Sequence, residues 1–275
     1  MNWSVLLENL PYLLWGAYPD GPLGGAALTL LLSIGSAIVS ALLGAVLGMA
    51  LAMSRGVLRH GLTLALGFFR AIPVLMLIFW TYFLLPIAFG INVPGVLSVM
   101  CALSLVGAAY LAHSVAAGID GIGDGQWQAG LSLGLPRRAV LRHIVLPQAL
   151  RMMAPSFVNQ WVTLIKDSSL AYIVGVGELS FMASQVNSRL MIYPAEIFML
   201  VGAVYFVLCS ALEQFAGWVA RYYRPEAMGA RRVRAELACP PSHSLVPLVA
   251  IPSLPREMPP HHLETERARG ALLAD

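Results

Sequence analysis

The feature that most constrains this chain is the stretch from Pro22 to Ser54, which contains no ionisable side chain. A helix rises about 1.5 Å per residue, so about 20 apolar residues cross the ~30 Å hydrocarbon core of a bilayer while satisfying their own backbone hydrogen bonds. Similar apolar runs recur along the chain, and charged residues make up only 11% of it, against about 25% in soluble domains. The sequence therefore predicts an all-α membrane protein with several spans.

The apolar runs predict five transmembrane helices within a domain that covers residues 23–220. Residues 1–22 precede them as a lead-in, either a short interfacial helix or an inert segment. Residues 221–275 are rich in Arg and Pro and are expected to form a largely disordered tail. The five helices are expected at about 26–52, 72–90, 95–117, 155–175 and 196–219.

The basic residues are distributed unevenly around these helices. The lead-in carries none, and the connection at 178–195, expected to be a mixed loop, carries only Arg189. The opposite side carries Arg55 and Arg59, then the arginines of the segment 118–154 and of the tail. Because cytoplasmic loops have an excess of Lys and Arg, we expect the N-terminus to be periplasmic and the C-terminus to be cytoplasmic.

Small residues recur every fourth position in the first helix, at Ser36, Ser40, Gly44 and Gly48. Such a stripe lets a second helix approach closely in lipid, so we interpret it as a packing surface.

Polar residues inside the apolar runs are candidates for a translocation path, because intramembrane ionisable groups are costly. Lys166, the only lysine, is followed directly by Asp167, and a membrane-boundary ion pair is the alternative interpretation. Arg70 follows a basic loop and an interfacial lead-in; we expect it at the headgroup boundary, with a channel-lining role as the alternative. The candidate path residues are Ser104, Tyr110, His113, Lys166, Asp167, Ser168, Ser169 and Glu178.

The longest polar interruption runs from Gly125 to Arg151. Gly134 separates two segments of helical composition, and Pro136 suits the first position of the second helix. Pro147 is expected to stop or kink that helix. The pattern predicts a helical hairpin at 124–151 on the cytoplasmic side, which is either a simple connector or a docking surface for a cytosolic protein.

This segment resembles the EAA motif of permease subunits of ATP-binding cassette importers. Three further segments are similar to the polar amino acid branch of that family, the histidine/glutamate/glutamine type. The motif residues are Gln128, Ala129, Gly130, Gly134, Ile144, Leu146 and Pro147. The branch residues are Lys166-Asp167-Ser168-Ser169-Leu170, Arg70-Ala71-Ile72-Pro73 and Ala109-Tyr110-Leu111-Ala112.

The resemblance implies the type I importer permease fold, with the hairpin inserted into a cleft of the ATPase subunit and Gly134 at its turn. It also implies a bacterial inner membrane, a periplasmic amino-acid-binding protein, and a second permease copy or a paralogue. Glutamate or aspartate is the substrate that the overall pattern most suggests. The motif departs from the family where Gln128 and Gly130 replace Glu and Ala, and His113 replaces a common Glu.

No other sequence motif supports a catalytic or metal-binding function. Gly130-Leu131-Ser132-Leu133-Gly134 matches a hydrolase nucleophile motif but lacks the strand that this motif needs. The sequence contains no Walker A motif, so we expect no enzyme activity and no cofactor in this chain, with ATP and Mg²⁺ on the partner ATPase. Neither His nor Cys residues form a metal motif. An ion-coupled secondary transporter is the alternative function, although we find no internal repeat of the kind such transporters show.

Overall fold

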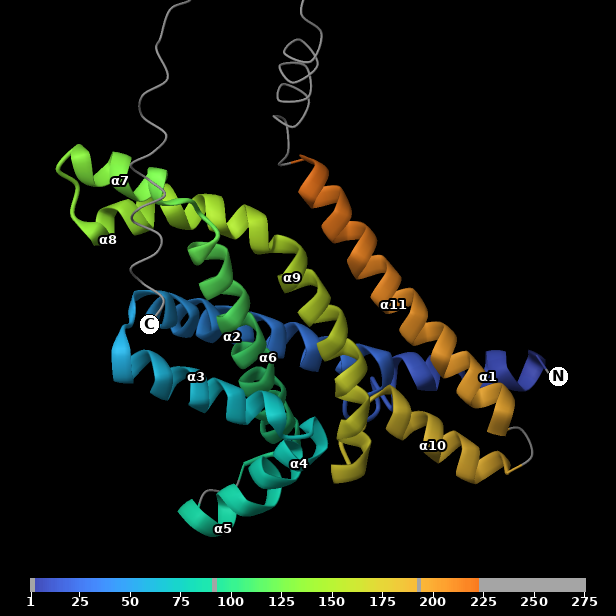
Figure 1. The fold of residues 1–275 in the computed structure, drawn as a ribbon. Helices are drawn as coiled ribbons and strands as arrows, with labels where there is room; N and C mark the ends of the chain where they lie inside the picture. Colours follow the sequence, from blue (N-terminus) through green and yellow to red (C-terminus); the bar gives the residue numbers. More distant parts are fainter. Residues whose placement is uncertain (1–2, 91–92, 192–193, 223–275) are drawn as a thin grey trace, which may run out of the picture. The chain divides into compact units, whose positions relative to one another are not determined.

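The computed structural model describes residues 3–90, 93–191 and 194–222, and these form helices joined by short connections (Figure 1). Within these ranges there is no β-sheet, only two isolated backbone bridges, so the prediction of an all-α fold is confirmed. The predicted tail lies almost wholly outside the described residues. The helices are α1 (Trp3–Trp15), α2 (Gly25–Met53), α3 (Gly56–Ala71), α4 (Val74–Phe79), α5 (Leu85–Phe89), α6 (Gly95–Asp120), α7 (Asp124–Ser132), α8 (Arg137–Val140), α9 (Leu146–Asp167), α10 (Leu179–Leu190) and α11 (Pro194–Tyr222).

Among the described helices, α2, α6 and the Pro194–Trp218 part of α11 are long and apolar enough to cross a membrane. The pair formed by α3 and the segment Val74–Phe89 makes a fourth span if it is counted as one, although it bends by 97°. The expected span at 155–175 falls on α9 and the 3₁₀ segment that follows it. This region is not among the helices apolar enough to cross a membrane, because it contains several polar residues. The count of five crossings therefore stays a prediction.

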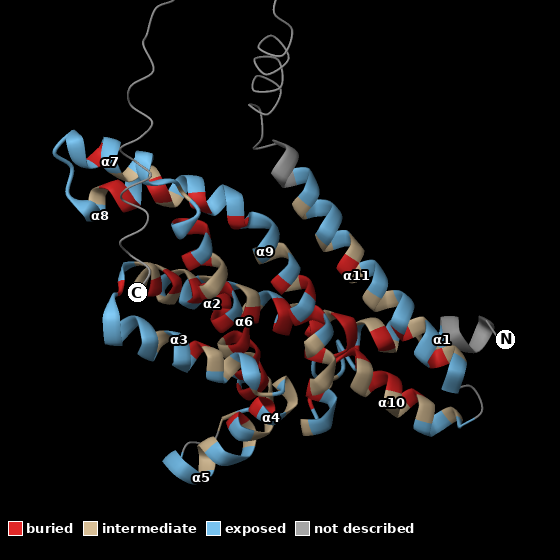
Figure 2. Cartoon of the chain, viewed as in Figure 1, coloured by how far each residue is buried: buried red, intermediate tan, exposed pale blue. Residues whose placement is uncertain are grey.

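The small-residue stripe of α2 packs against α6, as predicted, and the two helices run parallel. Ser40 lies against Gly107, Gly44 against Leu111 and Gly48 against Val115, so equal steps along both helices keep them in contact. A Cβ atom at Gly48 would lie 2.5 Å from the Cβ of Val115. This approach is possible only with glycine, and α6 is accordingly the most buried long helix (Figure 2).

Two segments expected to be irregular are helical. Residues 56–71 form α3, where we expected a basic loop through Arg59 and then an interfacial lead-in. Leu62, Leu66 and Phe69 form an apolar stripe at helical spacing that packs on α2 and α6. Residues 179–190 form α10, where we expected a mixed loop. Glu178 caps this helix by accepting hydrogen bonds from the backbone N–H groups of Ser180 and Phe181.

The prolines interrupt the helices less than expected. Pro147 does not stop its helix, because the π turn Leu141–Val145 precedes it and connects α8 directly to α9. The π turn Trp80–Leu84 stands in the same relation to Pro86, between α4 and α5. A π turn widens the helix where the proline lacks an N–H and its ring needs room. Helix α9 also begins at Leu146 rather than near Pro155, which lies inside it.

Candidate functional site

The hairpin of residues 124–151 consists of α7, a tight turn, and a second arm that starts at α8. Gly134 occupies the turn with φ +77°, a left-handed conformation that glycine adopts without strain. The N–H of Gly134 donates to the carbonyl of Leu131, and that of Leu135 donates to Gly130. The sequence folds this way because α7 ends at a glycine and Pro136 supplies the fixed φ that begins the next helix.

The two arms of the hairpin touch at Gly130. This glycine is buried, and a Cβ atom there would lie 2.8 Å from a methyl group of Val140. On the far side, Val140 and Val145 pack with Val115 and Ala149 in one buried cluster. The hairpin is therefore fastened to the end of α6 and the start of α9 by apolar contacts.

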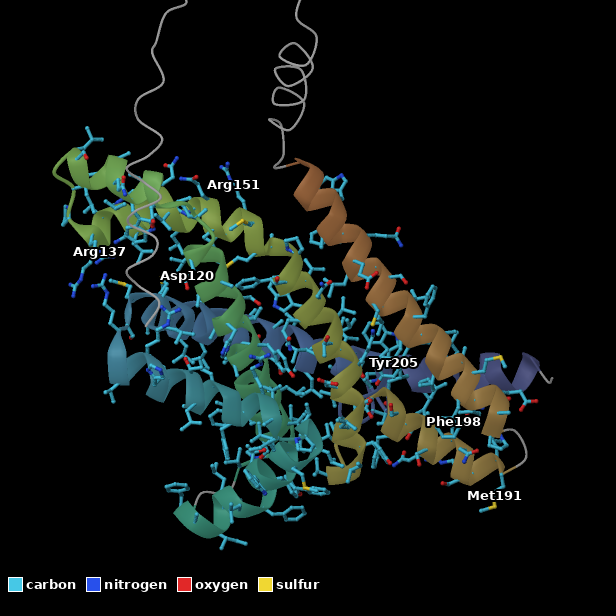
Figure 3. All side chains as sticks on the ribbon, viewed as in Figure 1. Asp120, Arg137, Arg151, Met191, Phe198 and Tyr205 are labelled. Carbon is cyan, nitrogen blue, oxygen red and sulfur yellow. The ribbon has the colours of Figure 1, made fainter. Side chains whose placement is uncertain are left out.

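The outer surface of the hairpin combines apolar and basic side chains. Leu133 is 79% exposed, and its neighbours from Leu131 to Arg138 are exposed as well. The guanidinium carbon of Arg137 lies 5.7 Å from the centroid of the Trp127 ring, while Arg138 and Arg142 are exposed. Figure 3 shows Arg137 at the hairpin and Arg151 near the start of α9. Exposed leucines ringed by cations are typical of a docking surface.

The structure brings the seven predicted coupling residues together on this hairpin. Gln128 and Ala129 are exposed on α7, whereas Gly130 is buried between the arms. Ile144 and Leu146 are half-buried against the hairpin cluster, and Pro147 and Gly134 are exposed.

The eight predicted path residues lie on α6, at the end of α9, in the 3₁₀ segment that follows it and at the start of α10. Tyr110 is 40% exposed and His113 is half-buried on α6, with a ring nitrogen 3.1 Å from the carbonyl oxygen of Ala109. Ser104 is buried on the same helix. Lys166, exposed, and Asp167, half-buried, end α9, and Ser168 and Ser169 follow in the 3₁₀ segment Ser168–Val174.

Glu178 lies apart from the other path candidates and is fully buried. Besides capping α10, its carboxylate accepts a 2.9 Å hydrogen bond from the Tyr205 hydroxyl of α11 and a longer one from Thr29 of α2. Burial raises its pKa to about 7, and the hydrogen bonds oppose that rise. These contacts make Glu178 a junction of three helices at the end where α2 begins.

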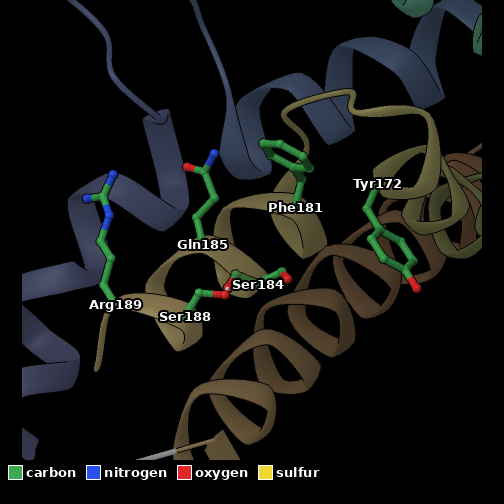
Figure 4. Close-up of a pocket in the computed structure, with 6 residues that line it drawn as sticks. All are labelled: Tyr172, Phe181, Ser184, Gln185, Ser188 and Arg189. Atoms are coloured by element: carbon green, nitrogen blue, oxygen red, sulfur yellow. Dashed lines mark hydrogen bonds between the residues drawn. The ribbon is translucent and has the colours of Figure 1, made fainter. Parts of the chain in front are cut away.

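A pocket of about 380 Å³ opens beside α10 at the same end (Figure 4). Arg189 lies on its rim and also over the ring of Tyr12, 5.3 Å from the centroid, while Gln185 accepts a hydrogen bond from the Tyr12 hydroxyl. The sequence did not predict this pocket, because residues 178–195 were expected to form a loop. The pocket is lined by Tyr172, Phe181, Ser184, Gln185, Ser188 and Arg189.

Sequence comparison identifies relatives over most of the chain. Residues 40–224 match the family described as "Binding-protein-dependent transport system inner membrane component". A "Probable amino-acid ABC transporter permease protein YckA" of Bacillus subtilis is 31% identical, over 81% of this chain and 93% of the relative. The "Glutamate/aspartate import permease protein GltK" of Escherichia coli is 29% identical, over 80% of this chain and 97% of the relative.

Solved structures share the fold. A crystal structure of an amino acid ABC transporter with histidines superposes with a TM-score of 0.70 at 22% identity, covering 81% of this chain and 99% of that one. An inward-facing MetNI methionine ABC transporter superposes with a TM-score of 0.64 at 21% identity, covering 71% and 92%. At these identities the likeness establishes the fold, which is that of type I importer permeases.

Proposed function

The chain belongs to the family of inner-membrane components of binding-protein-dependent transport systems, and from this premise we propose that it is the permease subunit of an ATP-driven importer of amino acids. Its relatives named for their substrates carry glutamate and aspartate, arginine, glutamine or cystine. Since GltK aligns over almost its whole length, glutamate or aspartate is the substrate we propose first.

The observation that carries this function is the hairpin. It presents an exposed apolar turn and several arginines on two arms fastened to α6 and α9. Because the sequence has no Walker A motif, ATP and Mg²⁺ would bind to a separate ATPase subunit. We assign the contact with that subunit to Gln128, Ala129, Gly130, Gly134, Ile144, Leu146 and Pro147.

The distribution of charge supports the orientation. Helices α2 and α6 run parallel, so Met53 and Asp120 mark the same end. The basic residues Arg55 and Arg59 lie at that end, as do the arginines of the hairpin, which follows α6. We therefore place this end of the helices, with the hairpin, on the cytoplasmic side of a bacterial inner membrane, and the N-terminus on the periplasmic side.

Transport would need further partners. A periplasmic amino-acid-binding protein would deliver the substrate, and a second copy of this chain or a paralogue would complete the pathway. In this proposal the candidate path residues on α6 and α9, such as Tyr110, His113 and Lys166, line one half of it. ATP binding would close the ATPase pair and move the hairpins, and the helices would then open outward.

Reconstitution tests the energy source. Vesicles containing this permease, its ATPase and its binding protein should accumulate labelled glutamate when ATP is supplied on the ATPase side. Collapse of the proton and sodium gradients should leave the rate unchanged. Uptake that follows an imposed ion gradient and ignores ATP would instead support the ion-coupled alternative.

A further inference from the structure

Arg70 lies on the face of α3 that meets α6, and two contacts fix the register of these helices. Arg59 forms an ion pair with Asp120, with 3.1 Å between Nη2 and Oδ2. The guanidinium carbon of Arg70 lies 4.9 Å from the centroid of the Tyr110 ring. Arg70 follows Arg59 along α3 and Tyr110 precedes Asp120 along α6 by almost the same number of residues, so the two helices run in opposite directions.

This register gives the depth of Arg70. At a rise of about 1.5 Å per residue, Tyr110 lies ~15 Å from Asp120 and ~22 Å from Gly95, the first residue of α6. The hydrocarbon core of a bilayer is about 30 Å thick. The register therefore supports a position of the guanidinium near the middle of the span, in place of the headgroup boundary that the sequence led us to expect.

A cation at this depth needs an acceptor. Among residues 3–90, 93–191 and 194–222, Arg59 forms an ion pair with Asp120, but no carboxylate oxygen lies within 4.0 Å of the Arg70 guanidinium. The Tyr110 ring stabilises the positive charge through its face but accepts few of the five N–H donors of the guanidinium. Arg70 is also exposed on this subunit, so an acceptor from outside the chain can reach it.

Helix α9 presents unpaired donors at the same level. Gly107 lies against Leu164 and Gly118 against Met153, an antiparallel register that puts Trp161 level with Tyr110. The indole N–H of Trp161 and the amide nitrogen of Gln160 are buried without a hydrogen-bond partner in the part of the chain that the structure describes. Buried polar groups are normally hydrogen-bonded, so these donors also indicate an acceptor supplied by a ligand.

We propose that Arg70 binds the α-carboxylate of the transported amino acid at the middle of the membrane, with Tyr110 holding the guanidinium in place. A planar carboxylate matches the paired N–H groups of arginine. His113 and Ser114 lie about one turn further along the same face of α6, towards the hairpin end. This inference rests on the proposed function, because it takes an amino acid as the cargo.

Direct binding tests the inference on the purified permease–ATPase complex without binding protein. The probe is labelled glutamate. Glutamine, which keeps the α-carboxylate, should compete with it, whereas isoglutamine, the α-amide of glutamate, should compete at least tenfold less well. Arg70→Gln should weaken glutamate binding roughly tenfold to 100-fold, the effect of losing a charged hydrogen bond, and Arg70→Lys should restore part of it.

Arg59→Gln is the matched control, because it removes an arginine from the same helix at the hairpin end and should leave glutamate affinity unchanged. Wild-type affinity in Arg70→Gln would overturn the inference, as would equal competition by glutamine and isoglutamine. If Arg70→Gln instead separates the two permease copies and spares glutamate binding, the acceptor is a carboxylate of the second copy and the inference is also wrong. Should Arg70→Gln fail to assemble, competition on the wild-type complex decides. If wild-type vesicles take up no amino acid at all, the proposed function fails first.

Discussion

The hydroxyl of Tyr205 donates a 2.9 Å hydrogen bond to a carboxylate oxygen of Glu178, so one buried contact ties α11 to the start of α10. The same carboxylate caps α10 and reaches Thr29 of α2. The consecutive helices α10 and α11 and the distant helix α2 therefore meet at a single side chain.

Replacing Glu178 with alanine should destabilise the fold by roughly 2–4 kcal/mol, because it removes the cap of α10 and the acceptor of the 2.9 Å hydrogen bond from Tyr205, whose hydroxyl keeps Ser180 as a partner. Tyr205→Phe, which removes one hydroxyl, should cost only about 1 kcal/mol. Thermal unfolding in detergent micelles measures both, with the exposed Glu8→Ala as control. Equal midpoints for Glu178→Ala and Glu8→Ala would contradict the junction.

The raised pKa of Glu178 gives stability a defined pH dependence. Burial lifts the pKa from 4.5 to about 7. A carboxyl group whose pKa is higher in the folded state stabilises the fold fully below the unfolded value, and this stabilisation is lost as the pH rises through the folded value. The wild type should thus lose up to about 3 kcal/mol between pH 4.5 and 7 from this group. Glu178→Gln cannot ionise, so its curve should be flatter; parallel curves would argue against a titrating Glu178.

The contact between α2 and α6 leaves no room for a methyl group at Gly48. A Cβ atom there would meet Val115 at 2.5 Å and the backbone oxygen of Ala112 at 2.6 Å, so Gly48→Ala should push the helices apart and cost about 1–3 kcal/mol. Gly202→Ala on α11 has open space and should be neutral or stabilising by up to about 1 kcal/mol. Unfolding midpoints in detergent compare the two, and the packing account fails if they shift alike.

The turn of the hairpin depends on the conformation of Gly134. With φ +77° and open space around its Cβ position, a substitution is penalised by the backbone alone. Gly134→Val should therefore reduce stimulated ATP hydrolysis and transport while the subunit still folds, whereas Gly134→Asn, which tolerates this conformation, should retain most of both. Normal coupling in the valine variant would count against the hairpin as the ATPase contact.

The exposed Leu133 should contribute to ATPase binding. Leu133→Asp replaces an apolar side chain that is 79% exposed, and we expect the permease–ATPase affinity to fall at least tenfold, or about 1–3 kcal/mol. Val57, at the same end and 90% exposed, provides the control, since Val57→Asp should leave the affinity unchanged. Co-purification and titration with the ATPase measure both, and similar losses would place the contact elsewhere.

The sequence was sufficient to predict the elements whose structure depends mainly on their own residues. Helix α2 was expected at 26–52 and occupies Gly25–Met53, because an uncharged run has no other stable state in lipid. The same reasoning failed for α3 and α10, where Arg59 and Arg189 made amphipathic helices resemble loops. The period of the apolar residues, as in Leu62, Leu66 and Phe69, was the signal that could have identified α3.

Some features of the candidate site could likewise be predicted from local sequence, whereas others depend on packing between helices. The turn at Gly134 follows from local chemistry, so its position in the sequence was sufficient to predict it. The pairing of Arg70 with Tyr110 depends on the register between two helices, which no pattern within either one specifies. The buried state of Glu178 is likewise a consequence of packing, since α1, α2, α10 and α11 converge around it.

One of the two π turns joins the hairpin to a long helix. Because the turn Leu141–Val145 lets the chain pass Pro147 without a break, α8 and α9 form one continuous helical segment from Arg137 to Asp167, which bends along α9 (Figure 1). Its ends carry the turn of the hairpin and the pair Lys166 and Asp167. A displacement of the hairpin would therefore act on a helical backbone that continues to the polar groups at its opposite end.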